Sequence, residues 1–106
     1  LKDLMIELGV NVSLFTSDGG TFAHLNGGSL PEVFKVANFG GWPDGDFNCL
    51  SEFQPDMPLM CGEFWNGWFD HFGEKHHTRK ADNLVPELEE FLKQGASFNI
   101  VEASMY

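Results

Sequence analysis

Short apolar runs alternate with amphipathic segments along this chain, and glycine or polar turns separate them. Residues 1–8 place leucine and methionine side chains on one helical face, and Gly9 follows as a helix stop. Apolar residues then alternate with polar ones over residues 10–14, which predicts a strand, and a polar glycine turn follows at residues 15–20. A short helical turn is expected at residues 21–25.

The middle of the chain repeats this order of strand and helix. A second apolar strand is predicted over residues 33–39, and a short amphipathic helix over residues 46–53. Residues 58–61 form an apolar run with the length of a strand that is buried on both faces. Gly62 ends that run, so Glu63 is expected at the carboxyl end of the strand.

The last third of the chain contains the best-marked helix. Residues 73–80 are polar and typical of a loop. A helix is predicted to begin near Val85, with Pro86 at its first position, and Gly95 ends it. Residues 97–101 predict a last strand. The order of strand, helix and strand throughout predicts an α/β fold with parallel strands and right-handed crossovers.

Composition limits the size of the fold and the class of partner. The 106 residues, 42% of them hydrophobic, suffice for one modest core, so residues 1–106 are expected to belong to one domain. A formal net charge of −10 argues against binding to nucleic acid or to an anionic membrane. Cys49 and Cys61 are too few for a disulfide framework, which indicates a reducing compartment such as the cytoplasm.

Aromatic residues crowd a single carboxylate directly after the third predicted strand. Indole rings stack on the C–H faces of sugars, carboxylates bind sugar hydroxyls, and burial tunes a carboxyl group for catalysis. The composition therefore suits a sugar site built on Glu63, but it suits an aromatic core near a strand end equally well. The aromatic residues in question are Phe64, Trp65, Trp68, Phe69 and Phe72.

The other candidate groups favour structural roles. Asp18 lies in a Ser-Asp-Gly turn, where a turn cap or a buried structural carboxylate is the more frequent role. Asp70 is expected to pair with Arg79 or with a histidine. Cys61 lies inside an apolar strand and is expected to be an inert core residue. Three histidines could join Asp70 in a zinc site, but they lack the usual ligand spacing, so no metal is expected: His71, His76 and His77.

Four motifs give the chain a resemblance to a known family. These are LFTSDG at residues 14–19, NFG at 38–40, PLMCGEFWNGWFDHFG at 58–73 and QGASFNI at 94–100. Together they resemble the family 35 glycoside hydrolases, which are retaining β-galactosidases. The third motif is long and chemically specific, whereas the NFG match alone would carry little weight.

The resemblance implies a fold, a reaction and two site residues. The family's catalytic domain is a (β/α)₈ TIM barrel, and the matching motifs correspond to its second half, strands five to eight. Glu63 then corresponds to the nucleophile at strand seven, and Trp65 to an aromatic residue of the sugar pocket. The acid/base glutamate of the family lies in a motif that would precede Leu1. The substrate implied is a terminal β-galactoside, and no cofactor is implied.

The chain departs from the family pattern at its end. The family continues with Tyr-Met-Phe and a Gly-Gly-Thr-Asn run, whereas this chain has residues 101–106, VEASMY, so the pocket tyrosine has no match. One carboxylate of the required pair is also missing from the motifs. An alternative hypothesis is therefore a non-catalytic half-barrel, which associates with another copy or with a missing N-terminal half and binds sugar without cleaving it.

Overall fold

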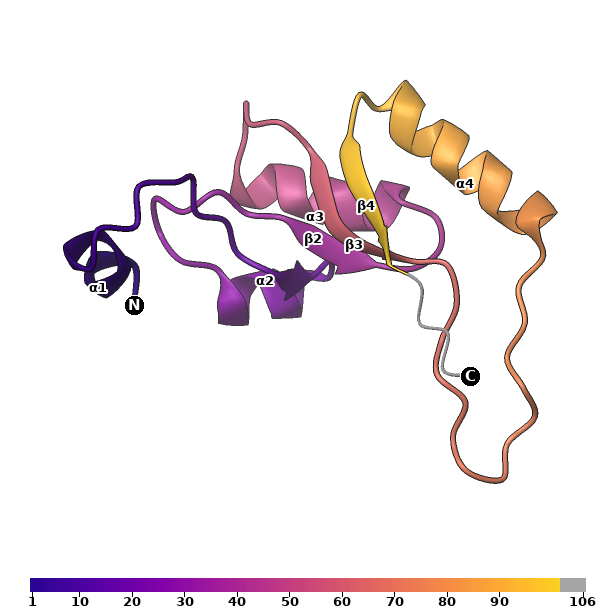
Figure 1. The fold of residues 1–106 in the computed structure, drawn as a ribbon. Helices are drawn as coiled ribbons and strands as arrows, with labels where there is room; N and C mark the ends of the chain where they lie inside the picture. The colour runs from indigo at the N-terminus through magenta and orange to yellow at the C-terminus, as the bar shows by residue number, and fades with distance from the viewer. Residues whose placement is uncertain (102–106) are drawn as a thin grey trace.

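The computed structural model describes residues 1–101, which form an alternating α/β structure after an N-terminal helix (Figure 1). From β1 onward, a helix separates every two consecutive strands, as the hydrophobic pattern predicts. The elements, in chain order, are α1 (Lys2–Glu7), β1 (Asp18–Gly19), α2 (Phe22–Gly28), β2 (Ala37–Phe39), α3 (Asp44–Phe53), β3 (Met60–Trp65), α4 (Ala81–Lys93) and β4 (Ser97–Val101).

The strands form one parallel sheet in the order β1-β2-β3-β4, which is also their order along the chain. Parallel neighbours require a crossover connection, because the chain must return to the same end of the sheet before it can start the next strand. The carboxyl ends of all four strands therefore lie at one end of the sheet. Side chains near these ends are gathered where ligands bind in parallel α/β folds.

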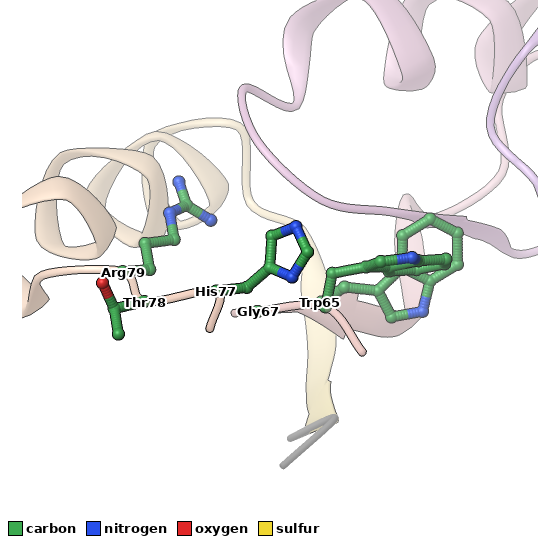
Figure 2. Close-up of a pocket in the computed structure, with 6 residues that line it drawn as sticks. Trp65, Gly67, His77, Thr78 and Arg79 are labelled. Atoms are coloured by element: carbon green, nitrogen blue, oxygen red, sulfur yellow. The ribbon is translucent and has the colours of Figure 1, made fainter. Parts of the chain in front are cut away.

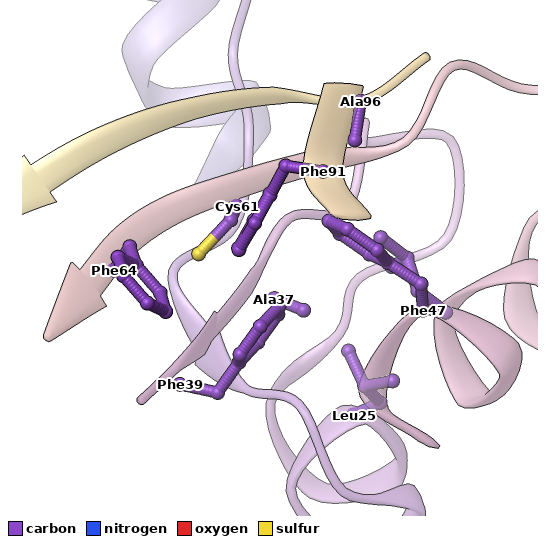
Figure 3. Close-up of a cluster of buried hydrophobic side chains, with 9 residues drawn as sticks. Leu25, Ala37, Phe39, Phe47, Cys61, Phe64, Phe91 and Ala96 are labelled. Carbon is purple, nitrogen blue, oxygen red and sulfur yellow. The ribbon is translucent and has the colours of Figure 1, made fainter. Parts of the chain in front are cut away.

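A cluster of aromatic rings fills the space between one face of the sheet and three of the helices (Figure 3). Phe91 of α4 is fully buried at its centre. The centroid of its ring lies 5.6 Å from Phe39, 5.3 Å from Phe47 and 5.0 Å from Phe64. Leu25 of α2 belongs to the same cluster. Because α2, α3 and α4 all contribute to it, they cover the same face of the sheet.

The prediction of a strand over residues 10–14 is wrong. Strand pairing begins with a single bridge between Phe15 and Phe34, and β1 has only two residues, Asp18–Gly19. The amide of Thr16 donates to the carbonyl of Phe34 at 2.8 Å, so contact with the sheet starts there. Alternating hydrophobicity predicts a strand only where a neighbouring strand satisfies the backbone, and the segment before Phe15 has no such neighbour within residues 1–101.

The second predicted strand is shorter than its apolar run. It was expected over residues 33–39, but β2 is limited to Ala37–Phe39. The backbone of Lys35 is satisfied by a side chain instead, since its amide donates to Gln54 Oε1 at 2.9 Å and its carbonyl accepts from Gln54 Nε2 at 2.7 Å. The residue that follows α3 thus takes the place that a neighbouring strand would have had.

Helix α4 begins at Ala81, so the prediction that it starts near Val85 with Pro86 at its first position is wrong. Pro86 lies inside the helix, where it cannot donate the hydrogen bond that the carbonyl four residues earlier would accept. Leu84 packs against the aromatic cluster. It lies one helical turn before Leu88, so burial of this apolar stripe extends the helix toward its N-terminus.

Other predicted boundaries agree with the structure. The first helix lies within residues 1–8, and the last strand is Ser97–Val101 as predicted. Gly95 ends α4 with a φ of 68°, a left-handed conformation that glycine adopts easily. Among the helices of residues 1–101, none is long and apolar enough to cross a membrane. The departure from the family pattern at residues 102–106 lies outside the described residues.

Candidate active site

Strand β3 contains one more residue than its neighbours between Cys61 and Phe64. On the β2 side, Ala37 pairs with Cys61 and the next residue, Asn38, pairs with Glu63. The β4 side shows the same extra residue, since three steps on β3 match two steps on β4. Gly62 therefore has no partner on β2, and the strand carries a β-bulge at residues 62–63.

The bulge determines which face of the sheet Glu63 occupies. Cys61 and Phe64 both belong to the aromatic cluster, although residues three apart on a regular strand point to opposite faces. The extra residue resolves this conflict, because it lets both side chains enter the core while Glu63 points away from it. In a regular strand with Cys61 in the core, Glu63 would face the core and Phe64 would face away from it.

Gly62 gives the bulge the space that it needs. A Cβ atom at this position would lie 2.9 Å from Asn38 Oδ1 and 2.9 Å from Val36 Cγ2. Real Cβ atoms essentially never approach so closely. Because Gly62 has no side chain, β3 can pass close to Val36 and Asn38 at the position directly before Glu63.

Glu63 and Trp65 are neighbours on the face opposite the core. The indole Nε1–H of Trp65 donates to Glu63 Oε2 at 3.2 Å, and both side chains are half-buried. Glu63 was predicted directly after a strand that ends at residue 61, but β3 continues to Trp65, so the carboxylate lies inside the strand near its carboxyl end. The structure thus brings together the two residues that the sequence singles out.

Asn38 lies beside Glu63 on the adjacent strand. The two residues are partners in the β2–β3 register. Asn38 Nδ2 donates to Ser17 Oγ at 2.9 Å. Its Oδ1 atom is buried and has no hydrogen-bond partner among the described residues. A second polar side chain therefore lies near the carboxylate at the same end of the sheet.

Asp18 does not approach Glu63. Its register partner is Ala37, which in turn pairs with Cys61, so two strand spacings of about 4.8 Å separate its backbone from β3. Its carboxylate lies against α2, because a Cβ atom on Gly28 would meet Asp18 Oδ1 at 1.7 Å. This position agrees with a structural carboxylate.

A hollow of about 240 Å³ lies next to Trp65 (Figure 2). The indole of Trp68 also borders it and meets Trp65 edge to face, with 5.4 Å between the ring centroids. Trp68 therefore packs against Trp65 and also borders the hollow. The residues that line the hollow are Trp65, Gly67, Trp68, His77, Thr78 and Arg79.

Asp70 organises the loop between β3 and α4. Its carboxylate lies 2.5 Å from His76 Nδ1 and 3.0 Å from His77 Nδ1. It also accepts a hydrogen bond from the backbone amide of His77 at 2.7 Å. The hydrogen bond with His76 is the main cause that lowers the pKa of Asp70 to about 2. The prediction that Asp70 pairs with a histidine or with Arg79 is confirmed for the histidines, and Arg79 instead pairs with Glu87 of α4.

The remaining candidates lie in the core or in ion pairs of the loop. Cys61 is fully buried, and burial raises the pKa of its thiol to about 11, so it is a core residue and a poor nucleophile. The third histidine of the loop, His71, pairs with Glu74 at 2.8 Å. Within residues 1–101, no group of three or more potential ligands is arranged to hold a metal ion.

Comparison with known proteins identifies the family of this chain. The sequence model of the glycosyl hydrolases family 35 matches residues 1–104. This chain belongs to glycosyl hydrolases family 35. The resemblance carried by the four sequence motifs is therefore confirmed.

Several curated relatives share this family 35 segment. A β-galactosidase of Xanthomonas manihotis is 44% identical over 88 residues, which cover 82% of this chain and 14% of that protein. The human β-galactosidase-1-like protein 3 is 35% identical over 94% of this chain and 15% of its own length. The mouse β-galactosidase is 36% identical over 89% of this chain and 15% of its own length. The chain thus spans about one seventh of the length of these relatives.

Two features of this family 35 segment were missed by sequence reasoning. The bulge at residues 62–63 was not predicted, because it appears only when the registers on both sides of β3 are compared. The part of the hollow formed by residues 77–79 was also missed. The adjacent histidines drew attention as metal ligands, whereas their common contact with Asp70 depends on the path of the loop.

Proposed function

We propose that this chain supplies the nucleophile of a retaining β-galactosidase and that Glu63 is the attacking carboxylate. The observation that carries this proposal is the bulge, which turns Glu63 away from the core while Cys61 and Phe64 remain inside it. Family membership and the names of the relatives support glycoside hydrolysis as the reaction class.

The contact with Trp65 suits Glu63 to this role. Retaining enzymes form a covalent bond between a carboxylate and the anomeric carbon, so the carboxylate must be held in line with that carbon. The indole N–H holds Oε2, and Oε1 has no hydrogen-bond partner within the described residues. We propose that Oε1 attacks while the indole ring of Trp65 faces the sugar.

A retaining mechanism also needs a second carboxyl group about 5–5.5 Å from the first. Asp18 cannot fill this role, because it lies two strands from β3 and faces α2. We propose that the acid/base glutamate belongs to residues outside this chain, as in the family pattern. The isolated chain is then expected to leave an aryl β-galactoside unhydrolysed.

We further propose that the four strands correspond to strands five to eight of a (β/α)₈ barrel. Two observations support this: the strands are parallel and follow one another in chain order, and three helices cover the same face. A complete barrel takes about 250 residues. Strands β1 and β4 are the edges of this sheet, so they are where the missing half would pair.

A mechanism-based inhibitor tests the role of Glu63. The complete product of the reading frame that encodes these residues would be treated with a 2-deoxy-2-fluoro-β-galactoside that has a good leaving group. The fluorine slows release of the glycosyl-enzyme, so peptide mapping should find the label on Glu63. Glu63→Ala should lose activity and regain part of it with azide, which fits the vacated space.

Glu74 provides a control carboxylate for this experiment. Glu74→Gln alters an exposed carboxylate of the nearby loop and should leave labelling unchanged. Label on another carboxylate would remove Glu63 from the nucleophile role. Binding of galactose without any labelling or turnover would favour the alternative hypothesis, a half-barrel that binds sugar without cleaving it.

A further inference from the structure

Asn38 is a buried amide that points toward the same face of the sheet as Glu63. Its neighbours in β2, Ala37 and Phe39, both belong to the aromatic cluster, so alternation along the strand turns Asn38 away from the core. The bulge turns Glu63 to that face as well, and the two residues are partners in the β2–β3 register. Neighbouring strands lie about 4.8 Å apart, so the Asn38 amide can reach the carboxylate.

One end of this amide has a hydrogen-bond partner and the other end has none. Asn38 Nδ2 donates to Ser17 Oγ at 2.9 Å, whereas Asn38 Oδ1 is buried and has no hydrogen-bond partner among residues 1–101. The whole residue is only 7% exposed, so bulk water has little access to the oxygen. A buried acceptor without a donor is unfavourable, and native structures rarely leave one in that state.

The unsatisfied oxygen of Asn38 lies beside the bulge that carries Glu63. A Cβ atom on Gly62 would be 2.9 Å from Asn38 Oδ1, so this oxygen is close to the backbone directly before the carboxylate. A carbonyl oxygen and an ionised carboxylate repel each other, because both only accept hydrogen bonds. The end of the amide that faces β3 therefore has the wrong polarity for its neighbour.

The Ser17 hydroxyl allows the opposite orientation, since a hydroxyl can donate as well as accept. If the amide of Asn38 turns over, Ser17 Oγ–H donates to Oδ1, and Nδ2 occupies the position beside Gly62. Nδ2 then faces Glu63, whose Oε2 accepts from Trp65 while Oε1 has no partner within the described residues. Both ends of the amide have a hydrogen-bond partner in this orientation.

From these observations we infer that Asn38 is a positioning residue for the nucleophile: Asn38 Nδ2 donates to Glu63 Oε1, and Ser17 holds the other end of the amide. A carboxylate held by Trp65 at one oxygen and by Asn38 at the other cannot rotate freely, so the free lone pair of Oε1 keeps one direction. Hydrogen bonds to a carboxylate also favour its ionised form. This inference rests on the proposed function and extends it, because it names a residue that orients the same carboxylate.

The pH dependence of kcat/KM tests which end of the amide faces the carboxylate. The complete reading-frame product would be assayed with an aryl β-galactoside, and the acid limb of the profile reports ionisation of the essential carboxylate in the free enzyme. Asn38→Ala removes a donor in the inferred orientation, so the acid limb should move up by about one pH unit and the plateau of kcat/KM should fall about tenfold. If an acceptor oxygen faces Glu63, the same change should move the acid limb down or leave it unchanged, and the inference is wrong.

Asn38→Asp keeps the shape of the side chain and tests whether it lies next to Glu63. A second carboxylate there should move the acid limb up by more than Asn38→Ala does, because like charges disfavour ionisation. Asn48 is the matched control, since it is an exposed residue of α3, which covers the opposite face of the sheet. Asn48→Ala and Asn48→Asp should leave the profile unchanged.

The possible results separate this inference from the function on which it rests. Thermal unfolding shows whether each variant folds, and Asn38→Ser, whose side chain is also too short to reach the carboxylate, replaces Asn38→Ala if the latter does not fold. An unshifted acid limb in Asn38→Asp overturns the inference, while labelling of Glu63 by the fluorinated galactoside leaves the proposed function standing. If the wild type is neither labelled nor active, the proposed function fails, and the role of Asn38 fails with it.

Discussion

Replacing Gly62 with alanine adds one methyl group at the point where β3 is bulged. The new Cβ would lie 2.9 Å from both Asn38 Oδ1 and Val36 Cγ2. Val36 is fully buried, and Asn38 Nδ2 is held by Ser17, so neither neighbour is a flexible side-chain end that can move away easily. Relief must therefore come from displacement of β3, and Glu63 is the next residue along that strand.

The size of the effect follows from these distances. Carbon atoms in contact prefer about 3.5–4.0 Å, so the methyl group needs about 0.6 Å of additional space. Overpacking of this kind costs about 1–3 kcal/mol, and loss of glycine flexibility in the unfolded chain offsets a part of it. We expect Gly62→Ala to lower the free energy of unfolding by about 1–2 kcal/mol. A misplacement of 1 Å can cost about 100-fold in rate, so kcat of the complete protein should fall about tenfold.

Urea unfolding followed by circular dichroism measures the stability of the chain, and steady-state kinetics on an aryl β-galactoside measures the rate of the complete protein. Gly45→Ala is the matched control. It adds the same methyl group to open space within α3, where alanine is preferred, so it should stabilise the chain by about 0.5–1 kcal/mol.

A second variant tests the contact itself. Val36→Ala removes the methyl group that the new Cβ would meet. Because the two residues share this contact, the combined Val36→Ala and Gly62→Ala variant should be destabilised by less than the sum of the single changes. If Gly62→Ala matches the wild type in both stability and kcat, β3 does not pass so close to β2, and the account of how Glu63 is presented is wrong.

Three further results are expected. Phe91→Ala should lower the free energy of unfolding by about 3–5 kcal/mol in urea titrations, because the buried ring of Phe91 contacts four other rings. Phe72 is fully exposed, so Phe72→Ala should change the free energy of unfolding by less than about 0.5 kcal/mol. Equal effects of the two changes would contradict the assigned core. The hydrogen bond with His76 lowers the pKa of Asp70 from 3.8 to about 2, so the stabilisation from ionised Asp70 should be complete above pH 3.8 and should disappear as the pH falls through 2. A ¹³C titration of the Asp70 carboxyl group with a midpoint near 3.8 would exclude this contact in solution. Ile100→Lys should reduce self-association of the isolated chain in sedimentation experiments, because a charge on the open edge strand β4 disfavours edge pairing; unchanged association would show that another surface is responsible.

The features of this fold that sequence predicted are those determined by local pattern. The end of α4 at Gly95 depends on one residue's conformational freedom, and the parallel order of strands depends on the alternation of strand and helix periods. The hydrogen bond between Glu63 and Trp65 was not predicted, because the apolar run ends at residue 61, whereas β3 continues to Trp65 and puts both residues on one face.

The features that sequence did not predict depend on contacts between distant segments. β2 is short because the side chain of Gln54 satisfies the backbone of Lys35, nineteen residues away. The bulge exists because the neighbouring strands on both sides set a register that a regular β3 cannot meet. The contact of Gln54 has no signal in the residues of β2, whereas Gly62 is a signal for the bulge that hydrophobic periodicity alone does not register.

Arg79 borders the hollow, yet its charge is already compensated. Its guanidinium donates to Glu87, a carboxylate of α4 that is only 4% exposed. His77, which also borders the hollow, contacts the Asp70 carboxylate through its imidazole. A sulfated or carboxylated saccharide would thus meet no unbalanced positive charge there, and it would approach a chain with a formal net charge of −10. If the proposed function holds, the ion pairs that hold this loop in place would favour neutral glycans over acidic ones at this surface.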